Sequence, residues 1–308
     1  MSASPRLPQT VGHRQPIRPY PIPTRRPLPR PWPAALPPRR PIQRNRAALI
    51  ALAMLMLIGM ATLIAPLIAP ADPMAVHLEV ALQPPSRAHP AGTDMFGRDV
   101  LSRVLYGGRL TFGAAVIAAI VATLPGTLLG LFAGYFGGLA DELISRLTDM
   151  ILAIPHLLLA LLIVAVVEPG MMGAALGVGL AGLPTAVRVV RSAVARARRM
   201  RYVMAARAVG CTESRILIRH VLPNVAGVVV VIATLQMGWA MLNASALSFL
   251  GLGAPPGVPE WGAMLNEGRL YLRQAPWIAA VPGVVLTLTI LAVNLVGDGL
   301  RDAIDPLG

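Results

Sequence analysis

The chain alternates between long apolar runs without charge and shorter segments that carry nearly all of its charge. Each apolar run can hold about 20 apolar residues, the length that an α-helix needs to cross a bilayer. These runs cover residues 47–71, 110–140, 150–167, 169–187, 221–259 and 274–297. The pattern therefore predicts an all-α, polytopic membrane protein with six transmembrane helices. Only Glu168-Pro169-Gly170 separates the third run from the fourth, which predicts a tight external hairpin there.

The composition supports a membrane protein rather than a soluble domain. Of 308 residues, 55% are hydrophobic and only 13% are charged, and the mean hydropathy is +0.65. These values are unusual for a soluble chain of this length. The single cysteine, Cys211, excludes an internal disulfide.

The positive charge is concentrated beside the predicted spans. All 27 basic residues are arginines, ten of them in residues 1–46 and nine in residues 188–220. Basic segments next to membrane helices normally stay in the cytoplasm. Six spans then place both termini in the cytoplasm, with 21 arginines inside and six outside. The formal net charge of +13 is thus explained by topology, and nucleic acid is not expected as a partner.

The same pattern divides the chain into four parts. Residues 1–46 contain thirteen prolines and ten arginines, which predicts a disordered cytoplasmic tail that anchors the topology or binds a partner. Residues 47–71 form the first span, and the polar segment 72–109 is external. Residues 110–308 form the core, with five spans and a basic cytoplasmic loop at 196–222.

The most structured part of this loop is the stretch from Arg201 to Asn224. Tyr202 to Ala208 favours a short helix, and Gly210 follows where a helix end needs positive φ. Thr212 can cap a second short helix with Glu213 in its first turn. Pro223 is expected to end that helix and begin the next element. On these residues alone, the segment is an ordinary basic helix-turn-helix loop.

Two motifs in the loop indicate a more specific function. They are Met204-Ala205-Ala206-Arg207-Ala208-Val209-Gly210 and His220-Val221-Leu222-Pro223-Asn224. Together they resemble the coupling loop of permease subunits of ATP-binding-cassette importers. The resemblance implies that a separate ATPase contacts this loop, through residues Tyr202, Met204, Ala205, Ala206, Gly210, Glu213, Arg215, Leu217, His220, Leu222 and Pro223. The family usually has an acidic residue where this chain has Met204, which puts any polar contact of that carboxylate in doubt.

Three further stretches resemble one branch of that family. Residues 89–112 (HPAGTDMFGRDVLSRVLYGGRLTF), 246–253 and 297–306 are similar to dipeptide and oligopeptide permeases. The chain is identified as a member of the C-type permease subunits of dipeptide or oligopeptide importers, with a nickel importer as the alternative. This implies a homologous second permease as heterodimer partner, two cytosolic ATPase subunits and an external substrate-binding protein, besides membrane lipid. ATP and Mg would then bind to the partner subunits, with no cofactor on this chain.

Candidate residues on the external side lie in two segments. Asp94, Arg98 and Asp99, with Arg103, are expected to form a local ion-pair lattice, and contact with a binding protein is the alternative. Glu260 and Trp261 lie in a proline-rich loop that is expected to help cover the external mouth of a pathway. The alternative for Trp261 is an anchor at the membrane interface.

Four polar residues interrupt the fifth apolar run: Gln236, Asn243, Ser245 and Ser248. Such side chains either join neighbouring helices by hydrogen bonds or line a path for the transported solute. The sequence leaves both interpretations open.

Several kinds of catalytic chemistry are missing from the sequence. There is no G-x-x-x-x-G-K-[ST] phosphate-binding loop, no His/Cys cluster with metal spacing and no nucleophile elbow. The chain is therefore not expected to be catalytic alone. An ATP-independent secondary transporter is a further alternative, although no internal repeat and almost no charge within the spans supports it. A membrane scaffold acting through the N-terminal tail is another.

Overall fold

The computed structural model describes residues 46–304, so the predictions for the N-terminal tail and for the last four residues lie outside the described part. Within residues 46–304 the elements are helices, with one isolated β-bridge between Thr93 and Asp99. The predicted all-α fold is confirmed.

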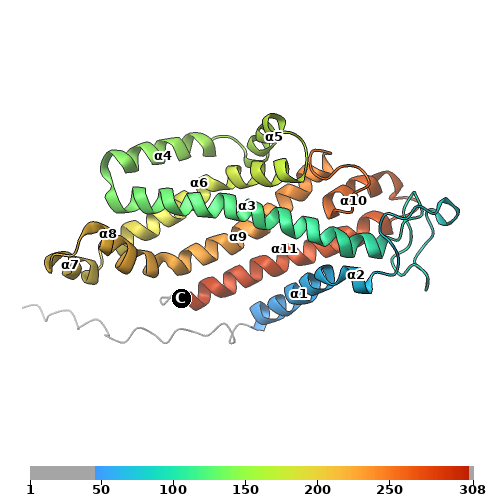
Figure 1. Ribbon diagram of the computed structural model, residues 1–308, viewed down its shortest axis with the longest axis horizontal. Coiled ribbons are helices and arrows are strands. Elements are labelled where there is room, and N and C mark those ends of the chain that lie inside the picture. The colour runs from blue at the N-terminus through green and yellow to red at the C-terminus, as the bar shows by residue number, and fades with distance from the viewer. Residues whose placement is uncertain (1–45, 305–308) are drawn as a thin grey trace, which may run out of the picture. The chain divides into compact units, whose positions relative to one another are not determined.

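Five long helices form the body of this part, as Figure 1 shows. They are α1 (Arg46–Leu63), α3 (Val100–Phe136), α6 (Met171–Ala197), α9 (Leu222–Phe249) and α11 (Trp277–Ile304). Six shorter α-helices are α2 (Ala65–Ile68), α4 (Gly138–Leu152), α5 (His156–Val167), α7 (Arg201–Ala208), α8 (Glu213–Ile216) and α10 (Trp261–Gly268). Short 3₁₀ turns lie at Leu78–Val80 and Arg269–Tyr271, and a π-helical turn lies at Leu217–Val221.

Close contact between α3 and α6 depends on small residues. A side chain at Gly130 would place its Cβ 2.9 Å from the carbonyl oxygen of Val187, and one at Gly134 would lie 2.6 Å from that of Arg191. These glycines therefore let the two backbones touch, as small residues do in membrane helices. Residues later in α3 contact residues later in α6, so the two helices run parallel.

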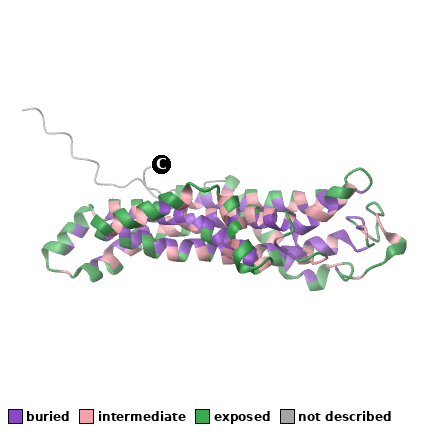
Figure 2. Cartoon of the chain, turned by 90° about the horizontal axis from the view of Figure 1, so that it is seen from above, coloured by how far each residue is buried: buried purple, intermediate pink, exposed green. Residues whose placement is uncertain are grey.

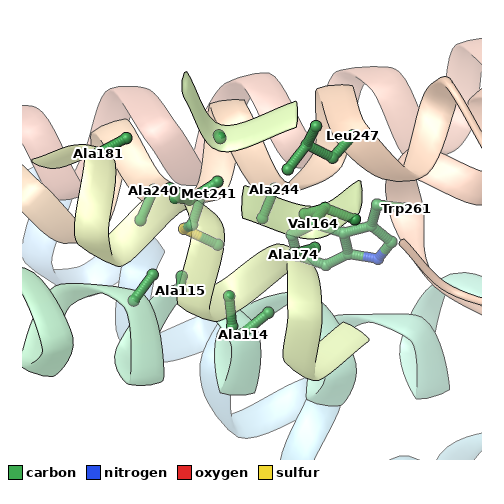
Figure 3. Close-up of a cluster of buried hydrophobic side chains, with 14 of the residues drawn as sticks. Ala114, Ala115, Val164, Ala174, Ala181, Ala240, Met241, Ala244, Leu247 and Trp261 are labelled. Carbon is green, nitrogen blue, oxygen red and sulfur yellow. The ribbon is translucent and has the colours of Figure 1, made fainter. Parts of the chain in front are cut away.

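The buried core continues from α3 and α6 onto α5 and α9. Figure 3 shows alanines of α3, α6 and α9 around Met241, Leu247 and Trp261. Along the long helices, buried positions alternate with exposed apolar ones at the helical repeat (Figure 2), as expected where lipid rather than water is the solvent.

Five helices are long and apolar enough to span a membrane, and α4 with α5 forms a bent pair that can serve as a sixth span. The predicted third span at 150–167 is corrected in detail. Its helix α5 has only 12 residues, about 18 Å, and meets α4 at 92°. Pro155 precedes α5 and lacks the N–H that a continuous helix would need there. The parallel course of α3 and α6 requires this bent pair to lead the chain back.

The predicted first and fifth spans also end earlier than expected. The helix α1 stops at Leu63, ahead of a short α2 with Pro66 in its first turn, and α9 stops at Phe249, with Gly251 at φ +85°. In both cases a residue that does not continue an α-helix interrupts a run that is still apolar.

Two ends of the helix bundle carry the non-membrane segments (Figure 1). The segment 72–99 and α10 lie at one end, and α7 and α8 lie at the other. The candidate residues predicted above divide between these ends and the middle of α9.

Candidate functional site

The turn after α7 has the geometry that the sequence predicts. Gly210 has φ +82°, its N–H donates to the carbonyl of Arg207 at 3.0 Å, and the N–H of Cys211 donates to the carbonyl of Ala206 at 3.1 Å. This pair of bonds is a Schellman motif, which ends a helix sharply and holds the next residues in place. The prediction for Gly210 is confirmed.

The segment after this turn differs from the prediction. Thr212 occupies the N-cap position of α8, but its hydroxyl lies 3.4 Å from that of Ser214 and caps no backbone N–H. Pro223 does not separate α8 from the fifth span. Residues Glu213–Phe249 instead form one continuous 37-residue helical run.

A π-helical turn at Leu217–Val221 makes this continuity possible. Pro223 has no N–H, and in a regular α-helix its ring would clash with the carbonyl of Arg219, four residues earlier. The backbone hydrogen bonds of the helix therefore change from a four-residue to a five-residue spacing, and the N–H of Leu222 donates to the carbonyl of Leu217. The loop 196–222 is therefore joined to α9 by helix rather than by a flexible link.

A second connection ties this loop to the end of α3. The hydroxyl of Tyr135 donates to the carboxylate of Glu213, which also accepts two hydrogen bonds from Arg207, each 2.9 Å long. The hydrogen bonds between the two side chains raise the pKa of Arg207 and lower the pKa of Glu213, because each group favours the charged form of the other. The guanidinium of Arg198 lies over the Tyr135 ring at 5.9 Å. The sequence predicted the position of Glu213 but not Tyr135 as its partner, because 78 residues separate them.

The loop has a buried inner face and an exposed outer face. Val203, Ala206, Ile216 and Val221 pack with the ends of α3 and α6. Ala205, in contrast to Ala206, is exposed. Among the other predicted residues, Leu217, His220 and Leu222 are half-buried, whereas Tyr202, Met204, Arg215 and Pro223 are exposed.

At the opposite end, three buried charged side chains, Asp94, Arg98 and Arg103, form a cluster with the half-buried Glu267. Asp94 accepts from Arg98 at 2.6 Å and from Arg103 at 2.5 Å. Glu267 accepts from the same arginines at 3.1 and 2.7 Å. The predicted ion-pair lattice is confirmed for Asp94, Arg98 and Arg103, and Glu267 was missed. It lies 164 residues from Arg103 in sequence, so no local pattern connects them.

Asp99 does not join this cluster. Its carboxylate caps α3 by accepting from the N–H of Ser102 at 2.7 Å, and it lies 3.0 Å from Nδ1 of His89. Expecting Asp99 in the arginine lattice was therefore wrong, because the N-terminus of α3 holds its carboxylate.

Glu260 and Trp261 are both buried structural residues. The Glu260 carboxylate caps α10 by accepting from the N–H of Ala263 at 2.9 Å, and it also accepts from the hydroxyl of Thr111 at 2.9 Å. Trp261 is fully buried within the core (Figure 3) and donates to the carbonyl of Val104 at 2.9 Å. The interpretation of Trp261 as an interfacial anchor is wrong, since no part of it is exposed. Asp94, Arg98 and Asp99 are buried as well.

The polar residues of α9 have different surroundings. Gln236 is buried and donates to the carbonyl of Gly182 on α6 at 2.8 Å, and the Ser248 hydroxyl accepts from the N–H of Ala254 at 3.3 Å. These two residues connect neighbouring elements. Asn243 bonds to its own helix at Trp239, and the buried hydroxyl of Ser245 has no hydrogen-bond partner within residues 46–304.

Comparison with known proteins identifies the family. Residues 126–307 match the family described as "Binding-protein-dependent transport system inner membrane component". The chain belongs to this family. Residues 39–85 also match the N-terminal transmembrane domain of oligopeptide transport permease C.

Individual relatives cover most of the chain. The dipeptide permease DppC of Alkalihalophilus pseudofirmus is 39% identical over 90% of both chains. The di/tripeptide permease DppC of Pseudomonas aeruginosa is 42% identical over 85% of this chain and 88% of its own. The glutathione permease GsiD of Shigella flexneri is 45% identical over 72% and 73%.

The fold has a solved counterpart. An inward-facing structure of the MetNI methionine ABC transporter matches 66% of this chain and 96% of the compared chain, with a TM-score of 0.54 and 17% identity. This protein is thus a multi-pass inner-membrane permease subunit of an ATP-binding-cassette importer, a class of transporter that has its ATPase on other chains. Within residues 46–304 no group of three or more His, Cys, Asp or Glu side chains is arranged to hold a metal ion.

Proposed function

We propose that this permease moves di- or oligopeptides and that its loop 196–222 receives the motion of a cytosolic ATPase. The observation that carries the coupling role is the exposure of four apolar or aromatic side chains on the loop, Tyr202, Met204, Val209 and Ile218, which together define what we call the apolar patch. Val209 is 80% exposed and Ile218 62% exposed, although both lie on a well-packed element. An exposed apolar patch with a polar surround is typical of a protein interface.

The connections of the loop explain how a push on this patch reaches the membrane. Glu213 links the loop to α3 through Tyr135, and the helical run from Glu213 to Phe249 links it to α9. Gln236 then links α9 to α6. Displacement of the patch would thus move several spans together between inward-open and outward-open states, as in other two-state transitions.

Contact with the ATPase would place the loop end of the bundle in the cytoplasm, and the nine arginines of residues 188–220 favour that side. The tail and the C-terminus would then also be cytoplasmic. The segment 72–99 would be external and would meet the binding protein. Because Asp94, Arg98 and Asp99 are buried, exposed apolar residues of this segment, such as Leu78 and Phe96, are the better candidates for that contact.

A second permease subunit has a suitable surface on α11. A shallow groove of about 400 Å³ there is lined by Ala280, Gly283, Val284, Thr287 and Leu288. Their three- and four-residue spacing places small residues on one face, as in packed membrane helices. The groove supports the proposed heterodimer.

Peptides are the proposed cargo because the relatives named above include dipeptide and di/tripeptide permeases that match along most of their length. Under this proposal the chain is not catalytic alone and binds no cofactor, and ATP and Mg bind to the partner subunits. Asn243 and Ser245 of α9 are the proposed residues of the pathway, since neither connects α9 to another element by a hydrogen bond within the described part.

Reconstitution in liposomes tests this function. The complete transporter, with both permeases, the ATPases and the binding protein, is expected to concentrate labelled dipeptides when ATP is supplied. This chain alone is expected to concentrate none. Accumulation by the chain alone would contradict the proposed dependence on an ATPase, and accumulation of Ni²⁺ rather than peptide would contradict the proposed cargo.

The patch itself is tested by Val209→Asp, compared with Thr212→Asp in the same exposed turn. Both add one negative charge to the loop, but only the first alters the apolar patch. Val209→Asp is expected to abolish co-purification of the ATPase and Thr212→Asp to preserve it. Equal loss with both variants would show that charge, rather than apolar contact, governs the interaction.

A further inference from the structure

A cavity of about 520 Å³ opens where α3, α4, α6 and α7 meet. Four arginines line it, Arg191, Arg198, Arg199 and Arg207, together with a single carboxylate from Asp141. The other lining residues are Ala133, Gly134, Gly137, Ala195 and Met204. The cavity is therefore strongly electropositive, and its small residues leave room for a ligand.

Two of these arginines are already paired within the protein. Arg191 binds Asp141 through two hydrogen bonds, and Arg207 binds Glu213. The other two form no ion pair within residues 46–304. The side chain of Arg198 contacts the carbonyl of Phe136 at 3.5 Å and the ring of Tyr135, and its charge also acts on the Glu213 carboxylate, which is already bonded to Arg207. The side chain of Arg199 has no hydrogen bond within the same residues. Adjacent guanidinium groups without carboxylate partners are suited to an anionic oxygen ligand such as a phosphate.

An apolar surface begins at the rim of the same cavity. Helix α4 starts directly after Gly137 and is amphipathic, with Asp141 and Asp149 paired to arginines of α6. Its other face presents Leu139, Leu143, Leu147 and Met150, all exposed, and Phe132 and Phe136 of α3 are exposed beside it. An amphipathic helix with this division lies at the boundary between headgroups and acyl chains.

We propose that this cavity binds the headgroup of an anionic phospholipid, whose acyl chains lie along the apolar face of α4. The phosphate would bind Arg198 and Arg199, and the chains would cover the leucines of α4. A soluble phosphate would satisfy the arginines but would leave the apolar face uncovered. Basic pockets between membrane helices on the cytoplasmic side are known to favour such headgroups. This inference requires the chain to lie in a membrane but does not depend on its cargo.

The test measures lipid bound to the purified full-length chain by native mass spectrometry, in titrations with phosphatidylglycerol and with phosphatidylcholine of the same acyl chains. The chain is expected to bind phosphatidylglycerol preferentially. The double variant R198Q/R199Q is expected to bind it about 30-fold more weakly, because each of the two basic residues near an anionic surface contributes roughly 1 kcal/mol. R198K/R199K, which retains both charges, is expected to recover most of the binding.

A matched control is R215Q/R219Q, which removes the same charge from exposed positions of the loop that do not line the cavity. It is expected to bind phosphatidylglycerol like the unaltered chain. Equal weakening in both double variants, or equal binding of phosphatidylcholine, would overturn the assignment. Displacement of phosphatidylglycerol by free glycerol phosphate at the same concentration as the lipid would also overturn the assignment, because it would indicate that the cavity binds a soluble anion. Displacement of the lipid on assembly with the ATPase subunits would show the cavity to be a protein contact instead.

Discussion

The surroundings of individual arginines in this permease determine what each one contributes. The side chain of Arg103 is 1% exposed and bonds to two carboxylates, whereas that of Arg146 is 71% exposed and pairs with Glu142. A buried charge that loses its partner leaves an uncompensated charge behind, but an exposed pair is screened by water. The two residues are therefore expected to respond very differently to substitution.

Arg103→Gln is predicted to destabilise the protein by about 3–5 kcal/mol, because it leaves Asp94 and Glu267 with Arg98 alone. Arg146→Gln is predicted to change stability by less than about 1 kcal/mol. Thermal unfolding of the two variants in the same detergent measures the difference. Similar melting temperatures would show that the cluster at 94, 98, 103 and 267 is not essential to stability.

Gly210 contributes to the turn after α7 through its backbone conformation. Its φ of +82° is unfavourable for most side chains by about 1–2 kcal/mol, although a Cβ at this position would have no neighbouring atom within 4 Å. Gly210→Val is predicted to separate ATP hydrolysis from peptide uptake, while Gly210→Asn, which tolerates this φ, is predicted to retain coupling. The ratio of peptide taken up to ATP hydrolysed in proteoliposomes is the measurement. Normal coupling in the valine variant would count against a rigid turn.

At the scale of elements, two connections hold the loop 196–222 against the bundle: the helical run from Glu213 into α9 and the bond from Glu213 to Tyr135. The first depends on the π-helical turn before Pro223, and the second on a single hydroxyl. Each can be altered separately, and the expected effects differ.

Tyr135→Phe removes only the hydroxyl that donates to Glu213. A hydrogen bond to a charged group contributes about 1.5–3 kcal/mol, less where water has access. The variant is predicted to increase hydrogen exchange in residues 201–216 by about tenfold without changing exchange in α6. A double-mutant cycle with Glu213→Gln is expected to show that the two changes are not additive. Additive effects would mean that the two side chains act independently.

Pro223→Ala restores the N–H that the π-helical turn avoids. The helix is then free to return to regular spacing, which would rotate α8 relative to α9 by about one residue, or roughly 100°. We predict reduced peptide uptake with little change in stability. A spin label on Cys211, the single cysteine, would report the rotation as a changed distance to a second label on α3. An unchanged distance would show that the π-helical turn does not depend on the proline.

At the scale of the whole molecule, the described part is a helix bundle with two differently built ends. The buried ion cluster and the capped helices α3 and α10 stabilise the end with segment 72–99. The other end presents the apolar patch at 202, 204, 209 and 218 and the arginine-lined cavity. The side chains of the first end are held by buried hydrogen bonds and ion pairs, whereas the second end presents exposed apolar side chains and arginines.

Much of this architecture is predictable because it depends on local pattern. The apolar runs indicate the spans, Gly210 indicates the turn after α7, and the family motifs indicate the loop. The break at Pro155 and the helical run through Pro223 were not predicted, although a proline is present at each. A proline can end a helix, bend it or induce a π-helical turn, and packing against neighbouring helices decides among these.

By itself, the sequence determined that this protein is an all-helical membrane permease and which loop carries its basic motif, since helical period, charge and motif are set by neighbouring residues. Only the tertiary structure decided which charges and hydroxyls meet. Glu267 joins Arg103 across 164 residues, and Tyr135 joins Glu213 across 78. It also decided that Trp261 and Glu260 lie inside the bundle. The physical reason is that burial and pairing depend on how helices far apart in the sequence pack together. A local sequence pattern does not determine that packing.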